Sequence, residues 1–90
     1  MSKTITFTVG PITAQEIEIM LTASAESGVQ IANNILLKSK GRKFLLTQPE
    51  AEYLRDEMLG DADRVSQGVS AGAGRAFEAA ADRLHRLLAR

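Results

Sequence analysis

The stretch Thr4-Ile5-Thr6-Phe7-Thr8-Val9 alternates three threonines with three large apolar residues, and Gly10-Pro11 follows it directly. Threonine, isoleucine, phenylalanine and valine all suit a pleated strand, and strict alternation puts the apolar residues on one face. The pattern therefore predicts a half-buried β-strand over residues 4–9. Gly10-Pro11 ends this strand, because proline lacks the N–H group that strand pairing requires.

The residues after this strand have the pattern of an amphipathic helix. Thr13 and Glu16 have the spacing of a capping box, in which each side chain accepts a hydrogen bond from a free backbone N–H at the helix start. We therefore expect the first helix to begin near Ala14 and to end near Glu26, because Gly28 favours a helix stop. An alternative is that this helix continues through Gly28.

Residues 29–39 fit more than one structure, and the choice decides which function fits the chain. A helix is favoured, because apolar residues recur at helical spacing from Ile31 to Leu36. The alternative is a hairpin, in which the second half of this stretch pairs with residues 42–47 around a turn at Lys40-Gly41.

The following residues predict a short strand and then a helix. Residues 43–47 are mostly of types that favour an extended backbone, and they predict a second short strand. Thr47 and Glu50 form a second capping box, and Pro49 lies in the first turn, where its missing N–H costs little. We expect the helix that starts there to end near Gly60.

The last third of the chain combines a glycine-rich segment with an amphipathic pattern. Three glycines fall within residues 68–74, which predicts a hinge, and apolar residues recur at helical spacing from Arg75 to Arg90. The sequence thus predicts a single α+β domain over residues 1–90, with two short strands and three to four helices. Residues 1–47 form a strand and helix half with a basic turn, and residues 48–90 form a helical half.

Composition excludes several classes of function. The 90 residues contain no cysteine, so disulfide scaffolds, thiolate zinc sites and cysteine nucleophiles are ruled out. His85 is the single histidine and has no carboxylate cluster at metal-ligand spacing. Residues 68–75 lack the Lys and the hydroxyl of a phosphate loop. We therefore expect neither an enzyme nor a bound cofactor or metal.

The hydropathy pattern bears on location. No run of large apolar residues is longer than three, as in Ile35-Leu36-Leu37, far below the roughly 20 residues of a transmembrane helix. The first residues alternate polar and apolar side chains instead of placing an apolar run after a basic one. We expect a cytoplasmic protein without a membrane span.

Small size, zero net charge and an amphipathic last helix after a hinge favour an interaction module. The function predicted from these features is that of an inhibitor, adaptor or regulatory subunit that binds another protein, and a homodimer is expected. The residues expected to contact the partner lie on the last helix and on the basic turn: Phe77, Leu84, Arg86, Leu87, Lys40 and Arg42.

Charge is distributed unevenly, which keeps nucleic acid as an alternative partner. Residues 1–43 have five Lys and Arg against three Asp and Glu, whereas residues 44–90 have six against eight. Four cations fall within six residues and form a basic patch: Lys38, Lys40, Arg42 and Lys43.

The order of elements over about residues 3–40 resembles the ribbon-helix-helix family of repressors and antitoxins. The resemblance rests on the alternating strand, on a helix that ends in Glu26-Ser27-Gly28, and on a second helix that begins at Val29. It implies a dimer in which two copies of the strand pair and place their polar face in the major groove of DNA. That face would be Thr4, Thr6 and Thr8, with the basic patch contacting DNA beside it.

Overall fold

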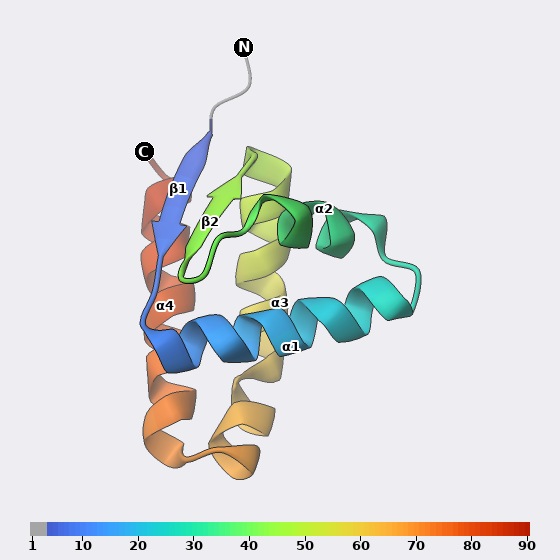
Figure 1. Ribbon diagram of the computed structural model, residues 1–90. Helices are drawn as coiled ribbons and strands as arrows, with labels where there is room; N and C mark the ends of the chain where they lie inside the picture. Colours follow the sequence, from blue (N-terminus) through green and yellow to red (C-terminus); the bar gives the residue numbers. More distant parts are fainter. Residues whose placement is uncertain (1–3) are drawn as a thin grey trace.

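The computed structural model describes residues 4–90, which form two strands and four helices in one small domain (Figure 1). The elements, in chain order, are β1 (Ile5–Thr8), α1 (Pro11–Glu26), α2 (Gln30–Lys38), β2 (Lys43–Leu46), α3 (Gln48–Gly68) and α4 (Ala71–Leu88). The α+β class predicted from the sequence is confirmed. Figure 1 shows α3 and α4 side by side, with the sheet and α1 in front of them and α2 beside β2.

The two strands pair with each other in an antiparallel sheet. Ile5 lies opposite Leu46 and Thr8 opposite Lys43, so the alternating apolar residues of β1 and of β2 share the inner face. The helix favoured for residues 29–39 is confirmed as α2, and the alternative hairpin of residues 35–39 with residues 42–47 is wrong. A tight turn does form at Gly41, which has a φ of 57°.

Helix α1 begins three residues earlier than predicted. Pro11 is the first helical residue, where its fixed φ suits the helix and its missing N–H costs nothing. Gly10 is therefore the N-cap, and no side chain caps this end. The predicted capping box of Thr13 and Glu16 is wrong, because both residues lie inside the helix. The alternative of a helix continuing through Gly28 is also wrong, since Gly28 has a φ of 92°.

Helix α3 begins as predicted and ends later. The Thr47 side chain accepts from the Glu50 backbone N–H at 3.3 Å, and the Glu50 carboxylate accepts from the Thr47 N–H at 2.9 Å, which confirms the capping box. The helix then continues through Gly60 to Gly68, not to the predicted end near Gly60. Packing along α4 outweighs the roughly 1 kcal/mol by which an interior glycine disfavours a helix.

The predicted hinge over residues 68–74 is mostly helix. Only Val69 and Ser70 separate α3 from α4, and the Ser70 side chain caps α4 by accepting from the Ala73 N–H at 3.0 Å. Gly74 lies against Ser66 of α3, where a Cβ atom would stand 1.8 Å from the serine hydroxyl oxygen. Glycine here allows the two helices to approach closely.

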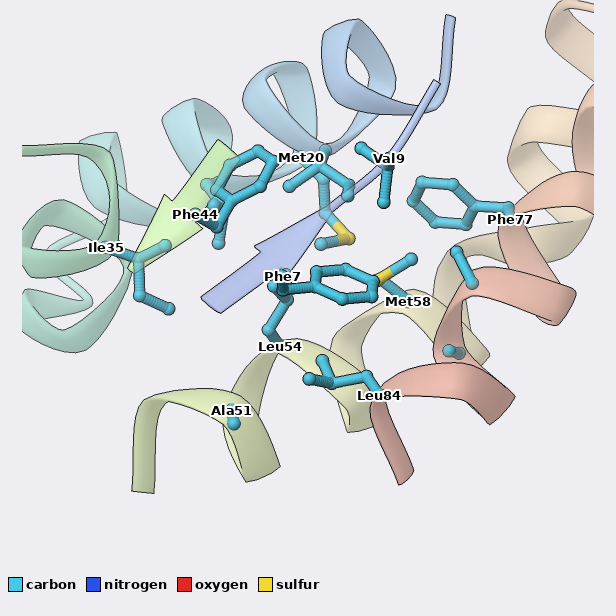
Figure 2. Close-up of a cluster of buried hydrophobic side chains, with 14 of the residues drawn as sticks. Phe7, Val9, Met20, Ile35, Phe44, Ala51, Leu54, Met58, Phe77 and Leu84 are labelled. Atoms are coloured by element: carbon cyan, nitrogen blue, oxygen red, sulfur yellow. The ribbon is translucent and has the colours of Figure 1, made fainter. Parts of the chain in front are cut away.

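The core joins both strands and all four helices. Figure 2 shows Phe7, Met20, Ile35, Phe44, Leu54 and Phe77 in one cluster. Phe77 and Leu84 of α4 are 0% exposed, so the apolar face of the last helix packs within the chain. Burial of such side chains contributes about 1.5–3 kcal/mol each.

Candidate functional site

The structure places the predicted partner-contacting residues in different environments. Phe77 and Leu84 lie in the core, and Leu87 is half-buried against it. Arg86 of α4 and the basic turn are exposed. The apolar part of the expected surface is therefore used inside the molecule, and its cationic part remains accessible.

The basic turn, residues 40–43, projects from one end of the sheet. The backbones of Lys40 and Lys43 pair across the turn. The Lys40 N–H donates to the Lys43 carbonyl, with 2.8 Å between N and O, and the Lys43 N–H donates to the Lys40 carbonyl at 2.9 Å. The Arg42 carbonyl accepts from the Val9 N–H at 3.1 Å, so the turn lies against the segment that joins β1 to α1. The side chains of Lys40, Arg42 and Lys43 are all exposed.

Lys38 differs from the other members of the basic patch. Its Nζ lies 2.5 Å from Glu50 Oε1 and pairs with that carboxylate. Burial alone would raise the pKa of Glu50, but the hydrogen bonds from Lys38 and from the Thr47 N–H outweigh it and lower this pKa below its usual value. Lys38 thus has an acidic partner at the start of α3.

The outer face of the sheet carries the three threonines singled out from the sequence. Thr4, Thr6 and Thr8 are exposed, and Lys43 lies opposite Thr8 on the same face. Alternate residues of an antiparallel strand turn their backbone groups toward the partner. The Val9 N–H points toward β2. The backbone N–H and C=O groups of Thr6 and Thr8 therefore point the other way, toward the free edge of β1. The described chain offers the Thr6 backbone no hydrogen-bond partner there.

Two arginines of α4 meet the start of α1. A groove of about 430 Å³, here called the α1/α4 groove, has Gly10 and Thr13 in one wall and Arg83 and Arg86 in the other. Arg83 donates a hydrogen bond to the Thr8 carbonyl, and its guanidinium stands 5.0 Å from the centre of the Phe7 ring. This guanidinium is therefore held in a defined position.

Sequence reasoning missed most of this groove. Arg83 and Arg86 are three residues apart, which places them on one helix face, so that pair was visible in the sequence. Gly10 and Thr13 meet them only through the packing of α1 on α4, a long-range contact with no local signal.

A larger hollow, about 590 Å³, lies on the exposed face of α1. Its wall contains Glu18 and Glu26 and no cation, and it lies away from the basic turn. His85 is exposed, with Nδ1 3.2 Å from Arg55 Nη1. Among residues 4–90 no cluster of three or more His, Asp or Glu side chains is arranged to hold a metal ion.

The described cations differ in whether they pair with a carboxylate. Lys38 pairs with Glu50, Arg55 with Asp56, and Arg64 with Asp61 and Glu16, whereas Arg75 on the exposed side of α4 has no such partner. Around the Val9–Gly10 segment are five more cations without a carboxylate partner in the described chain: Lys40, Arg42, Lys43, Arg83 and Arg86. We call these five residues the basic surface, and it is suited to binding anionic groups.

Within the part of the chain that the structure describes, no helix is both long enough and apolar enough to cross a lipid bilayer. Comparison of the chain with protein-family models, with curated proteins and with solved structures finds no match.

Proposed function

We propose that this protein is a non-enzymatic interaction module, an inhibitor, adaptor or regulatory subunit, that binds an acidic segment of another protein. The observation that supports this is the basic surface, where five cations lack carboxylate partners while Lys38, Arg55 and Arg64 are paired. A cationic surface on a chain of zero net charge attracts acidic groups locally without binding every polyanion strongly.

The surface has features of a protein-binding site beyond its charge. The free edge of β1 presents unpaired backbone groups, and Leu45 is 38% exposed on the adjoining sheet face. An extended acidic segment lying along this edge would gain backbone hydrogen bonds from β1 and charge contacts from Arg83 and Arg42. Arginine suits this role because its guanidinium can bind a carboxylate with two parallel hydrogen bonds.

Fluorescence anisotropy of a labelled oligoglutamate peptide tests this function, at low salt and at about 0.15 M ionic strength. We expect saturable binding that is lost when Lys40, Arg42 and Lys43 are all changed to Glu. Arg42→Glu and Arg75→Glu change the net charge by the same amount, so Arg75→Glu on an exposed part of α4 is the charge-matched control for Arg42→Glu and should retain most of the binding that Arg42→Glu loses. Equal loss in Arg75→Glu, or no binding by the unaltered protein at low salt, would contradict the proposal.

A second candidate is the dimeric ribbon-helix-helix DNA binder. Two features favour it: residues 30–38 are helical, as that family requires, and Thr6, Thr8 and Lys43 share one exposed face of a two-stranded ribbon. β1 pairs with β2 of its own chain, so a copy of the protein would have to add at the free edge of β1.

This second candidate has its own test. Thr6→Pro removes the N–H at the free edge of β1, and an edge strand tolerates proline at such a position. For a dimeric DNA binder, the unaltered protein elutes as a dimer and binds a mixed-sequence duplex with steep salt dependence. Thr6→Pro then elutes as a monomer and binds the duplex weakly. A monomer in both cases, or no duplex binding at low salt, would remove this candidate.

A further inference from the structure

We propose that a second copy of this chain packs against the outer face of α1, with the two α1 helices antiparallel, to form a closed twofold dimer. The proposal concerns association of the chain with itself and does not rest on the proposed function. It uses a surface other than the free edge of β1, which belongs to the sheet.

The outer face of α1 has the residue spacing of a helix-packing seam. Five exposed residues follow one another at intervals of three, four, three and four: Ile12, Gln15, Ile19, Thr22 and Glu26. Side chains at these intervals lie in one stripe along a helix, and this is the repeat by which two helices pack in a coiled coil. We call this stripe the α1 seam. Its two isoleucines, Ile12 and Ile19, are 58% and 47% exposed, so a second helix would bury apolar surface there.

The hollow of about 590 Å³ runs along the same stripe. It is lined by four members of the α1 seam together with Glu18 and Ala23: Gln15, Ile19, Thr22 and Glu26 complete the wall. Every residue of this wall belongs to α1, and Figure 1 shows the helix crossing in front of α3 and α4. Ala23 is small, so a side chain of a second helix can enter beside it, as a knob enters a hole.

Charge along α1 matches a second copy in the antiparallel orientation. The helix contains no Lys or Arg, and its exposed acids, Glu18 and Glu26, have no cation partner among the described residues. The positive end of the helix dipole lies at the opposite end of α1, where Arg83 and Arg86 of α4 stand beside Gly10. Parallel helices would place Glu26 of the two copies together, whereas antiparallel helices place each Glu26 at the positive start of the other α1.

This arrangement is self-complementary. Packing centred on Ile19 places the two copies of this residue together near the twofold axis, and it brings the first turn of each α1 against the last turn of the other. Each charge contact is therefore made twice, and the assembly closes at two copies. Because α1 has 16 residues and is about 24 Å long, the interface is small, which predicts a weak and reversible dimer.

Analytical ultracentrifugation over a range of protein concentrations tests the dimer. We expect a monomer–dimer equilibrium that weakens as salt screens the contacts at the ends of α1. Ile19→Asp should weaken dimerisation at least about tenfold, because it places an unpaired carboxylate at the centre of the interface. Leu59→Asp is the matched control, since Leu59 is 51% exposed on α3 and lies outside the hollow. A monomer at all concentrations, or equal weakening by the two variants, would overturn the proposal.

Cross-linking of single-cysteine variants tests the orientation, because the sequence contains no cysteine of its own. With a short bismaleimide linker, we expect Ile19→Cys to cross-link to itself. Ile12→Cys should cross-link to Glu26→Cys and not to itself. Leu59→Cys measures the background from random collisions. Cross-linking of Ile12→Cys to itself as efficient as that of Ile19→Cys would refute the antiparallel arrangement.

Two further variants test the charge contacts and separate this dimer from one formed at the sheet edge. Glu26→Arg should weaken dimerisation, and adding Arg86→Glu to the same chain should restore part of it, because the facing ends of α1 then exchange their charges. A double variant no better than Glu26→Arg alone would contradict the proposal. Thr6→Pro should leave the dimer intact. A dimer that is lost in Thr6→Pro and kept in Ile19→Asp would be assigned to β1 instead.

Discussion

At the scale of single residues, Glu50 links two helices through one oxygen atom. Its Oε1 accepts hydrogen bonds from Lys38 Nζ, at the end of α2, and from the Thr47 N–H, at the start of α3. Because Glu50 is buried, loss of its charge removes the ion pair with Lys38 and weakens both of these charge-assisted hydrogen bonds.

This arrangement predicts how stability depends on pH. The pKa of Glu50 is lowered in the folded protein, so its contribution is fully present above the unfolded-state pKa, near 4.5. The contribution is lost as the pH falls through the lower, folded-state pKa. Urea denaturation across this range should show that Glu50→Gln costs about 1–2 kcal/mol at neutral pH and that the variant loses less stability in acid. The exposed Glu78→Gln serves as control, and identical acid profiles for Glu50→Gln and the unaltered protein would contradict this prediction.

Replacing Tyr53 is expected to affect stability in the opposite direction to replacing Glu50. Its hydroxyl oxygen is buried near Ser24 and Glu57 but makes no hydrogen bond of normal geometry in the described chain, and burial raises the pKa of this tyrosine. An unsatisfied buried hydroxyl lowers stability, so Tyr53→Phe should leave the free energy of unfolding unchanged or raise it by up to about 1 kcal/mol. Thermal denaturation measures the effect, and a loss of stability would mean that the hydroxyl has a partner in solution.

At the scale of elements, the contact between α3 and α4 predicts opposite effects for two glycines of α4. A Cβ at Gly74 would lie 2.8 Å from Ser66 Cβ and 3.0 Å from Ser66 Cα, which side-chain rotation cannot relieve. Gly74→Ala should therefore cost about 1–3 kcal/mol. At Gly72 the nearest atoms are 3.9 Å away, so Gly72→Ala should gain up to about 1 kcal/mol from helix propensity.

Chemical denaturation of the two variants provides the comparison. Ser66→Gly combined with Gly74→Ala should recover part of the loss, because it removes the atoms that the new Cβ meets. A Gly74→Ala protein as stable as Gly72→Ala would show that the helices are further apart than the structure places them.

The elements predicted well are those with strong local signals. The alternating residues of β1, the helical spacing from Ile31 to Leu36 and the capping box of Thr47 all act between near neighbours in sequence. The helix end predicted at Gly60 and the hinge predicted around Gly74 were wrong, because glycine disfavours an isolated helix whereas tertiary packing stabilises α3 and α4.

The candidate site likewise contains residues that the sequence predicted as a group and residues that only tertiary packing brings together. Lys40, Arg42 and Lys43 are adjacent in sequence and were predicted as a group. The meeting of Arg83 with Thr13 depends on how α1 crosses α4, which no local pattern reports.

At the scale of the whole molecule, α4 is predicted to be essential for folding. Ending the chain after Gly68 removes Phe77 and Leu84 from the core and uncovers Phe7 and Leu54. Because small domains are marginally stable, this fragment should lack a cooperative thermal transition. Circular dichroism during heating tests this. A fragment that melts cooperatively would show instead that α4 can detach, as the sequence suggested.

The pairing of β1 with β2 also governs the life of the nascent chain. On the ribosome, β1 emerges with Ile5 and Phe7 exposed, and its partner strand is made only after α1 and α2. The core against the inner face of the sheet is then completed only when Phe77 and Leu84 have been synthesised. Throughout that interval the emerging polypeptide has an incomplete apolar core, so chaperone capture and aggregation compete with folding.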